Sequence, residues 1–133
     1  MHPLFDLTGR VALVTGGSKG LGKAMALGFA EAGAKVFLCS RHADELASAA
    51  AEIESQTRSE VAWTTSDMSR REECPRLAQH VLDRMGRVDI LVNNAGSNIP
   101  QTIDQITDLD WDRIVELNLS SCMALTRALV PQM

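Results

Sequence analysis

The stretch Thr15-Gly16-Gly17-Ser18-Lys19-Gly20-Leu21-Gly22 separates an apolar run at 11–14 from a segment rich in helix-forming residues. A glycine-rich turn between a strand and a helix lets the backbone approach a phosphate closely. The free N–H groups at the start of the helix then bind the negative charge. We therefore expect this stretch to hold the pyrophosphate of a dinucleotide, through Thr15, Gly16, Ser18, Lys19, Gly20, Leu21 and Gly22.

This stretch has two alternative interpretations. Gly17 to Lys23 follows the start of the phosphate-loop pattern G-x-x-x-x-G-K-[ST]. Ala24 stands where that pattern needs a hydroxyl to hold magnesium, so we do not expect hydrolysis of a nucleoside triphosphate. The second alternative is a plain strand-to-helix turn that is rich in glycine and binds nothing.

Outward from this stretch, short strand patterns alternate with longer helical ones. A strand–helix alternation predicts βαβ units, and we expect an α/β fold with a Rossmann-like, doubly wound parallel sheet that is truncated after about four strands. A capping box at Thr107 and Asp110 predicts a later helix, with Trp111, Ile114, Val115 and Leu119 on one face. The expected strands are 11–14, 35–39, 61–65 and 88–92, and the expected helices are 21–32, 43–55, 71–85 and a last one through 123–133.

Composition narrows the class of protein. The 133 residues suffice for one domain, and the net charge of −4 with scattered basic residues argues against a nucleic-acid partner. Three cysteines without C-x-x-C spacing indicate neither a disulfide framework nor a zinc site, and the histidines show no metal-ligand spacing. Without a signal peptide or a long apolar run, we expect a cytoplasmic protein with no membrane segment and no metal.

Two motifs at this separation resemble the short-chain dehydrogenase/reductase family. They are T-G-x-x-x-G-x-G at 15–22 and Asn93-Asn94-Ala95-Gly96 after the fourth expected strand. The resemblance extends from Gly9 to Met133 and covers the first half of a usual family member. It implies that residues 1–133 form an incomplete NAD(P)-binding Rossmann domain whose catalytic C-terminal part is absent. It also implies an oxidoreductase that interconverts a hydroxyl and a ketone on a small molecule. The start, LFDLTGR at 4–10, is similar to gluconate 5-dehydrogenases, with 3-oxoacyl-carrier-protein reductases as near neighbours.

The resemblance also assigns roles to residues after the third and fourth strands. Asn94, Ala95 and Gly96 would line the cofactor groove, and Asn94 would bond back to the Thr15 loop. Asp67, followed by Met68, would face the amino group of adenine. Alternatively, the asparagines only form a turn, and Asp67 only caps a helix or lies in solvent.

The end of the second strand predicts which cofactor is bound. An acidic residue there favours the ribose hydroxyls of NAD, whereas a basic residue accommodates the 2′-phosphate of NADP. This chain has Ser40-Arg41 at that point, and Lys19 in the glycine loop is a second cation. We therefore expect NADP(H) to be preferred, with NAD(H) as a possible cofactor.

Catalytic residues are largely missing from the sequence. Asn118 matches the family asparagine that holds a proton-relay water, although it is equally interpretable as a residue of a kinked helix. The family serine and its Tyr-x-x-x-Lys have no counterpart, because the chain contains no tyrosine and its last lysine is Lys35. Two hypotheses follow. The chain is an N-terminal fragment of an NADP-dependent oxidoreductase and inactive alone, or it is a non-catalytic dinucleotide-binding or interaction protein with a Rossmann fold.

Truncation of the sheet would also affect assembly. The strand at 88–92 would become an apolar edge with unpaired backbone groups. The helix that carries Met123, Leu125 and Leu129 would expose apolar surface, because in the family the equivalent helix packs against another subunit. We expect the isolated chain to self-associate and a complete form to be a homodimer or homotetramer.

Overall fold

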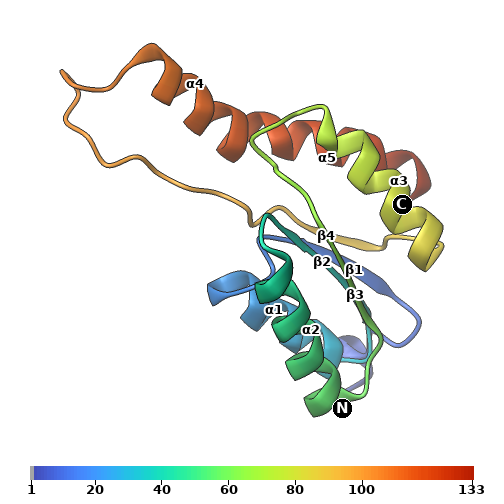
Figure 1. The fold of residues 1–133 in the computed structure, drawn as a ribbon. Coiled ribbons are helices and arrows are strands. Elements are labelled where there is room, and N and C mark those ends of the chain that lie inside the picture. Colours follow the sequence, from blue (N-terminus) through green and yellow to red (C-terminus); the bar gives the residue numbers. More distant parts are fainter. Residues whose placement is uncertain (1) are drawn as a thin grey trace.

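A computed structural model describes residues 2–133, which form one parallel sheet between two layers of helices (Figure 1). The spatial order of the strands is β3-β2-β1-β4, and every pair is parallel. Strand order therefore reverses at β1 and places the carboxyl ends of β1 and β4 side by side, which is where doubly wound sheets bind ligands. The predicted fold class is confirmed. The strands are β1 (Val11–Thr15), β2 (Lys35–Ser40), β3 (Val61–Thr65) and β4 (Ile90–Val92).

The helices cover both faces of the sheet. One layer holds α1 and α2, and the other holds α3 and α5 (Figure 1). Their bounds are α1 (Gly20–Glu31), α2 (Ala43–Thr57), α3 (Glu73–Met85), α4 (Asp108–Val115) and α5 (Ser121–Leu129), with a π-helical turn at Glu116–Ser120 and short 3-10 turns at Pro3–Phe5 and Val130–Gln132.

The two inner strands are apolar on both faces because helices cover both. In β1, Leu13 packs toward α3 and α5, whereas Val14 packs toward α1 and α2. In β2, Phe37 and Leu38 divide in the same way, and all four side chains are fully buried. Burial on both sides is what a continuous apolar run predicts for a parallel sheet. The two buried clusters, one on each face of the sheet, fix the positions of the strand ends that carry the loops.

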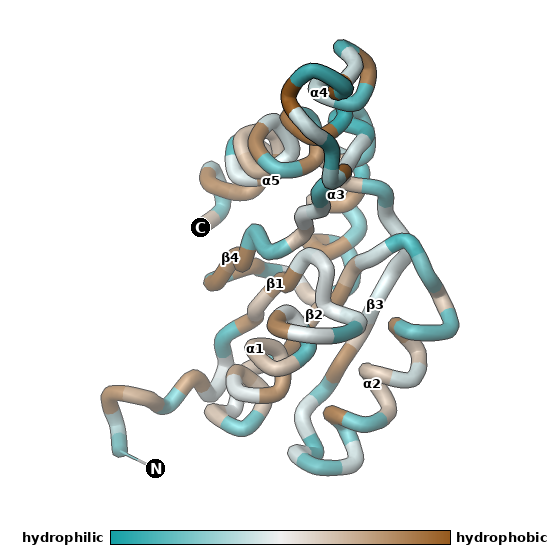
Figure 2. The backbone as a smooth tube through the Cα atoms, turned by 90° about the vertical axis from the view of Figure 1, so that its left-hand side faces the viewer, coloured by the Kyte–Doolittle hydropathy of each residue, from teal (hydrophilic) through white to brown (hydrophobic). Residues whose placement is uncertain are grey.

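Strand β4 begins two residues later than the sequence predicts. The Val88 N–H donates to Oε1 of Gln132 at 3.0 Å, and the Val88 carbonyl accepts from Nε2 of Gln132 at 3.1 Å. Asp89 pairs instead with Val11 of β1. Figure 2 shows β4 as the outermost strand on its side of the sheet. The expected apolar edge is therefore present but shorter, because the Gln132 side chain already bonds to the backbone N–H and carbonyl of Val88.

The last helices form one continuous rod rather than two separate elements. The predicted cap is confirmed, since Oγ1 of Thr107 accepts from the Asp110 N–H at 3.1 Å. The predicted common face is wrong, because Trp111 is 57% and Leu119 66% exposed while Ile114 is partly buried. Leu119 lies inside the π-helical turn at Glu116–Ser120, whose extra residue per turn shifts it out of phase with α4.

The expected apolar surface of the last helix also differs from the structure. Leu125 and Leu129 are fully buried against α3, so they cannot form an outer surface. Met123 is exposed as expected, and Leu119 and Val130 are exposed with it, at spacings that place the three along one side of the rod. Within residues 2–133, no helix combines the length and apolar character needed to cross a membrane.

Candidate functional site

The hydroxyl of Thr15 joins the two sequence motifs at the carboxyl ends of β1 and β4. Its Oγ1 accepts from the N–H groups of Asn94 and Ala95, at 3.0 and 2.9 Å, and donates to the carbonyl of Val92 at 3.3 Å. Thr15 is buried, so no solvent competes for these bonds. The glycine loop and the turn after β4 therefore form one structural unit.

Asn94 completes this unit from the other side. Its Nδ2 donates to the carbonyls of Thr15 and Gly16, each at 3.1 Å. The expected bond from Asn94 back to the Thr15 loop is thus present. An amide that binds two carbonyls of one turn has a structural role that a simple turn former would lack.

Close packing explains two glycines of the loop. A Cβ built on Gly22 would lie 2.2 Å from the Gly16 carbonyl oxygen and 2.5 Å from Nδ2 of Asn94. Gly16 itself has φ +61°, a conformation that side chains disfavour. The loop can therefore fold back on the start of α1 only with glycine at these positions. No side chain caps α1, whose first N–H groups remain available for an anion.

A cavity of about 630 Å³ opens beside this loop. It extends from the glycine loop past the ends of β2 and β3 to the turn after β4 and the adjoining face of α4. Of the residues proposed from the sequence, Thr15, Gly20, Leu21, Gly22 and Asn118 do not line it. Those that do are Gly16, Ser18, Lys19, Ser40, Arg41, Asp67, Met68, Asn94, Ala95 and Gly96.

Three cations line this cavity without forming a salt bridge to any described residue. Lys19, Arg41 and Arg113 line it, and none of them forms a salt bridge among residues 2–133. Lys23, the lysine of the alternative phosphate-loop pattern, instead pairs with Glu52 of α2. The cations of the cleft are therefore available to bind an anionic ligand, whereas Lys23 already forms a salt bridge.

Asp67 occupies the wall between β3 and α3. Its Oδ1 accepts from the N–H and the hydroxyl of Ser69, at 2.9 and 2.6 Å, so the residue does stabilise a turn. Partial burial opposes ionisation, but the bonds from Ser69 and the nearby Arg41 guanidinium outweigh it and lower the pKa of Asp67. The carboxylate is charged at neutral pH and lines the cavity.

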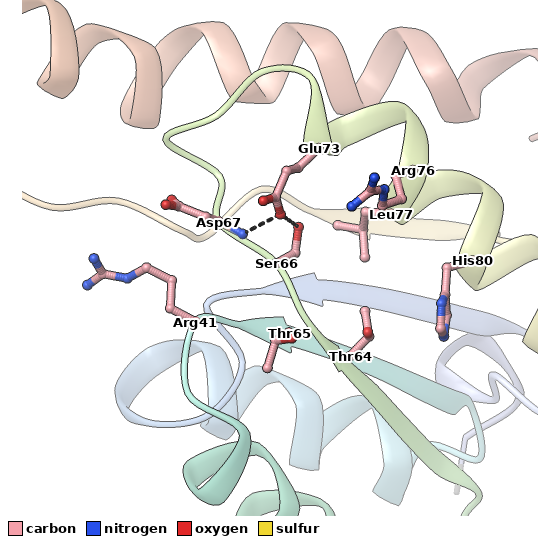
Figure 3. A pocket seen from close by; sticks show the side chains of 9 residues that line it. All are labelled: Arg41, Thr64, Thr65, Ser66, Asp67, Glu73, Arg76, Leu77 and His80. Carbon is pink, nitrogen blue, oxygen red and sulfur yellow. Dashed lines mark hydrogen bonds between the residues drawn. The ribbon is translucent and has the colours of Figure 1, made fainter.

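A second cavity of about 430 Å³ lies between the outer edge of β3 and α3 (Figure 3). Its walls include Arg41 and Asp67, which also line the larger cavity. Glu73 accepts from the Ser66 hydroxyl at 3.1 Å and from the Asp67 N–H at 2.9 Å, and so fixes the segment between the two cavities. Only the larger cavity contains the glycine loop, and the candidate site is placed there.

Asn118 lies in the π-helical turn and binds the loop that follows β4. Its Nδ2 donates to the carbonyls of Ser97 at 2.8 Å and Ile114 at 2.9 Å, and its Oδ1 accepts from the Ser97 N–H at 3.2 Å. Asn118 thus lies in a distorted part of the helix, and its role toward a proton-relay water stays a prediction. The bonds hold Ser97 against the helix, beside the cavity that Ser97 lines.

Several lining residues were not predicted from the sequence. Glu45 comes from the first turn of α2, and its Oε2 accepts from the Ser18 hydroxyl at 3.2 Å. Arg113, Ile114 and Leu117 come from the rod of α4 and the π-helical turn. Their helical spacing and their position just before Asn118 were the available signals. Residues 2–133 contain no group of three or more His, Cys, Asp or Glu side chains placed to hold a metal ion.

Comparison with known families and curated proteins gives a consistent result. A family model described as short chain dehydrogenase matches residues 10–133. A rhamnolipid-biosynthesis 3-oxoacyl-[acyl-carrier-protein] reductase of Pseudomonas aeruginosa is 38% identical over 98% of this chain and 50% of its own length. The chain thus spans about half the length of such relatives.

Solved structures of similar proteins have the same fold as this chain. The Pseudomonas aeruginosa RhlG/NADP active-site complex has a TM-score of 0.91 at 39% identity and is matched over 99% of this chain and 51% of that one. An L-sorbose reductase from Gluconobacter frateurii, complexed with NADPH and L-sorbose, has a TM-score of 0.93 at 36% identity, over 97% of this chain and 49% of that one.

Proposed function

Because this chain belongs to the short-chain dehydrogenase family, we propose that it forms the dinucleotide-binding part of an NADP(H)-dependent oxidoreductase that interconverts a hydroxyl and a ketone. The observation that carries the proposal is the cleft itself. It joins a glycine loop at an uncapped helix start to two cations, Lys19 and Arg41, that form no salt bridge among the described residues.

The residues present fit a dinucleotide phosphate. The start of α1 would bind the pyrophosphate, and Lys19 and Arg41 would bind the 2′-phosphate. The charged Asp67, with Met68 beside it, would receive the adenine end, while Asn94 to Gly96 would line the path toward the nicotinamide. When bound, the nicotinamide would supply or accept a hydride. The residues of this chain would bind the cofactor and orient it.

Exchange of Arg41 for aspartate tests the cofactor assignment. We expect the chain to bind NADPH more tightly than NADH, and R41D to reverse that preference. Loss of a charge-assisted contact weakens NADPH binding about tenfold or more, and the new carboxylate can accept from a ribose hydroxyl. Fluorescence titration with both cofactors measures the ratio.

The matched control for R41D is R127D. Arg127 lies in the last turn of α5, does not line the cleft and forms no salt bridge within residues 2–133. It carries the same change of charge, so R127D is expected to keep the preference for NADPH. Equal or tighter binding of NADH by the unmodified chain would refute the assignment to NADP(H).

The substrate class is proposed from two relatives of similar identity. One is a 3-oxoacyl reductase and the other an L-sorbose reductase. A small ketone or alcohol, such as a 3-oxoacyl group or a gluconate/5-ketogluconate type of polyol, fits the substrates named for both relatives.

We place the protein in the reducing cytoplasm because Cys39, Cys74 and Cys122 are free thiols.

A non-catalytic dinucleotide-binding protein remains the second candidate function. It needs only the binding cleft, and the 133 residues contain no tyrosine and no lysine after Lys35. Both candidates require the cleft to bind a dinucleotide, so the titration above tests what they share. Turnover distinguishes them.

We further propose that the chain self-associates. The exposed stripe of Leu119, Met123 and Val130 and the outer edge of β4 are its apolar surfaces. Sedimentation velocity over a range of concentrations is expected to show dimers or larger species, and the doubly charged variant L119K/M123K is expected to shift them toward monomer. A monomer at all concentrations would contradict this proposal.

A further inference from the structure

Glu45 places a carboxylate inside a cleft whose other features favour anions. It lies in the first turn of α2 and lines the same cavity as Ser18, Lys19 and Arg41. Its Oε2 accepts from the Ser18 hydroxyl at 3.2 Å, and Ser18 is only 8% exposed. Neither cation forms a salt bridge with it. The negative charge of Glu45 is therefore not neutralised by the cations of the cleft.

This carboxylate affects two cofactors differently. NADP(H) and NAD(H) share every group except the 2′-phosphate, which carries up to two negative charges. A like charge in the same partly enclosed cavity repels that phosphate, and the repulsion is larger there than in bulk water. Glu45 also holds the Ser18 hydroxyl, which could otherwise donate to a phosphate oxygen. NAD(H) brings no such phosphate and avoids the repulsion.

We propose that Glu45 is a specificity-determining residue that weakens binding of the 2′-phosphate and thereby keeps the preference for NADP(H) below what Lys19 and Arg41 alone would give. The inference rests on the proposed function. It concerns how far one cofactor is preferred and assigns Glu45 no part in proton or hydride transfer.

The test replaces Glu45 by glutamine, which removes the charge and keeps an oxygen that can accept from Ser18. Equilibrium titrations of the purified chain with NADPH and with NADH are compared. We expect E45Q to bind NADPH about three- to tenfold more tightly, the effect of removing one like charge from a partly screened site. The affinity for NADH is expected to change by less than about twofold, since the interacting phosphate is absent.

Asp44 provides the matched control. It is the neighbouring acid in the same turn of α2, it is exposed, and it does not line the cavity. D44N removes the same charge from the same end of the helix, so it changes the helix dipole interaction equally. We expect D44N to leave the NADPH-to-NADH ratio within about twofold of the unmodified chain, because its charge is screened by solvent.

Ionic strength gives a readout that a merely structural role would not affect. The gain of E45Q for NADPH is expected to shrink as salt rises from about 0.02 M to about 0.5 M, because the repulsion that it removes is then screened. Equal effects of E45Q on both cofactors, weaker NADPH binding, or the same ratio in E45Q and D44N would each overturn the role of Glu45. Failure of the unmodified chain to bind either cofactor would instead refute the proposed function.

Discussion

Alanine at Gly22 is expected to destabilise the chain by about 3 kcal/mol or more and to weaken NADPH binding more than tenfold. The added Cβ would lie 2.2 Å from the Gly16 carbonyl oxygen, a backbone atom that cannot turn aside like the end of a flexible side chain. Either α1 moves away from the loop or the loop opens. Chemical denaturation gives the loss of stability, and fluorescence titration gives the loss of affinity.

Gly28 is the matched control because it lies in the same helix. A Cβ there meets nothing within 4 Å, and the residue is exposed. G28A is therefore expected to stabilise the chain by about 0.5–1 kcal/mol through its higher helix propensity. If G22A were as stable as G28A and bound NADPH normally, the close contact between loop and helix would not be needed for the site.

The second large effect concerns chemistry. We expect the 133-residue chain to bind NADPH without reducing a 3-oxoacyl or sugar ketone substrate. A positioned acid contributes about a hundred- to ten-thousand-fold to such a proton transfer, and the tyrosine that supplies it in the family is not in this sequence. Loss of NADPH absorbance in the presence of each ketone measures turnover.

G22A also serves as the control for this experiment. Turnover by a contaminating reductase would persist in a G22A preparation, whereas turnover by the chain itself would fall together with cofactor binding. Steady turnover by the pure chain that G22A abolishes would therefore contradict the expectation. It would show that another group in this chain donates the proton.

Most of the fold could be predicted because its signals are local. The strand at 61–65 is found at the predicted residues, α3 ends at Met85 next to Gly86 as expected, and α1 ends at Glu31, one residue earlier than predicted. The errors arise from contacts between distant residues. Val88, at the start of the predicted fourth strand, bonds to Gln132, and Asn118 in the π-helical turn bonds to Ser97. Periodicity in a sequence contains neither.

The candidate site likewise contains residues that the sequence predicts and residues that only the three-dimensional packing brings together. Its motif residues, such as Lys19 and Asn94, could be predicted because they are adjacent to the glycine loop or to a strand end. Glu45 and Arg113 enter the cavity from helix faces, and their inclusion depends on how α2 and the rod lie against the sheet. Asp67 stabilises a turn and also lines the cavity, so its local bonds do not keep it out of the site, and its contact with adenine stays a prediction.

The Thr15 hydroxyl has a consequence for how this protein can diverge. Because one oxygen accepts from the N–H groups of both Asn94 and Ala95, a mutation to valine would leave the Ala95 amide without its acceptor and the Asn94 amide with only the Val92 carbonyl, whereas serine would keep the shared hydroxyl. Thr15 and Asn94 lie 79 residues apart in the sequence, yet one side chain constrains both motifs. A lineage that loses the hydroxyl at position 15 is expected to carry a compensating change in the turn at 94–95. Recombination that exchanges only one of the two motifs should succeed only when the resulting chain has Ser or Thr at position 15.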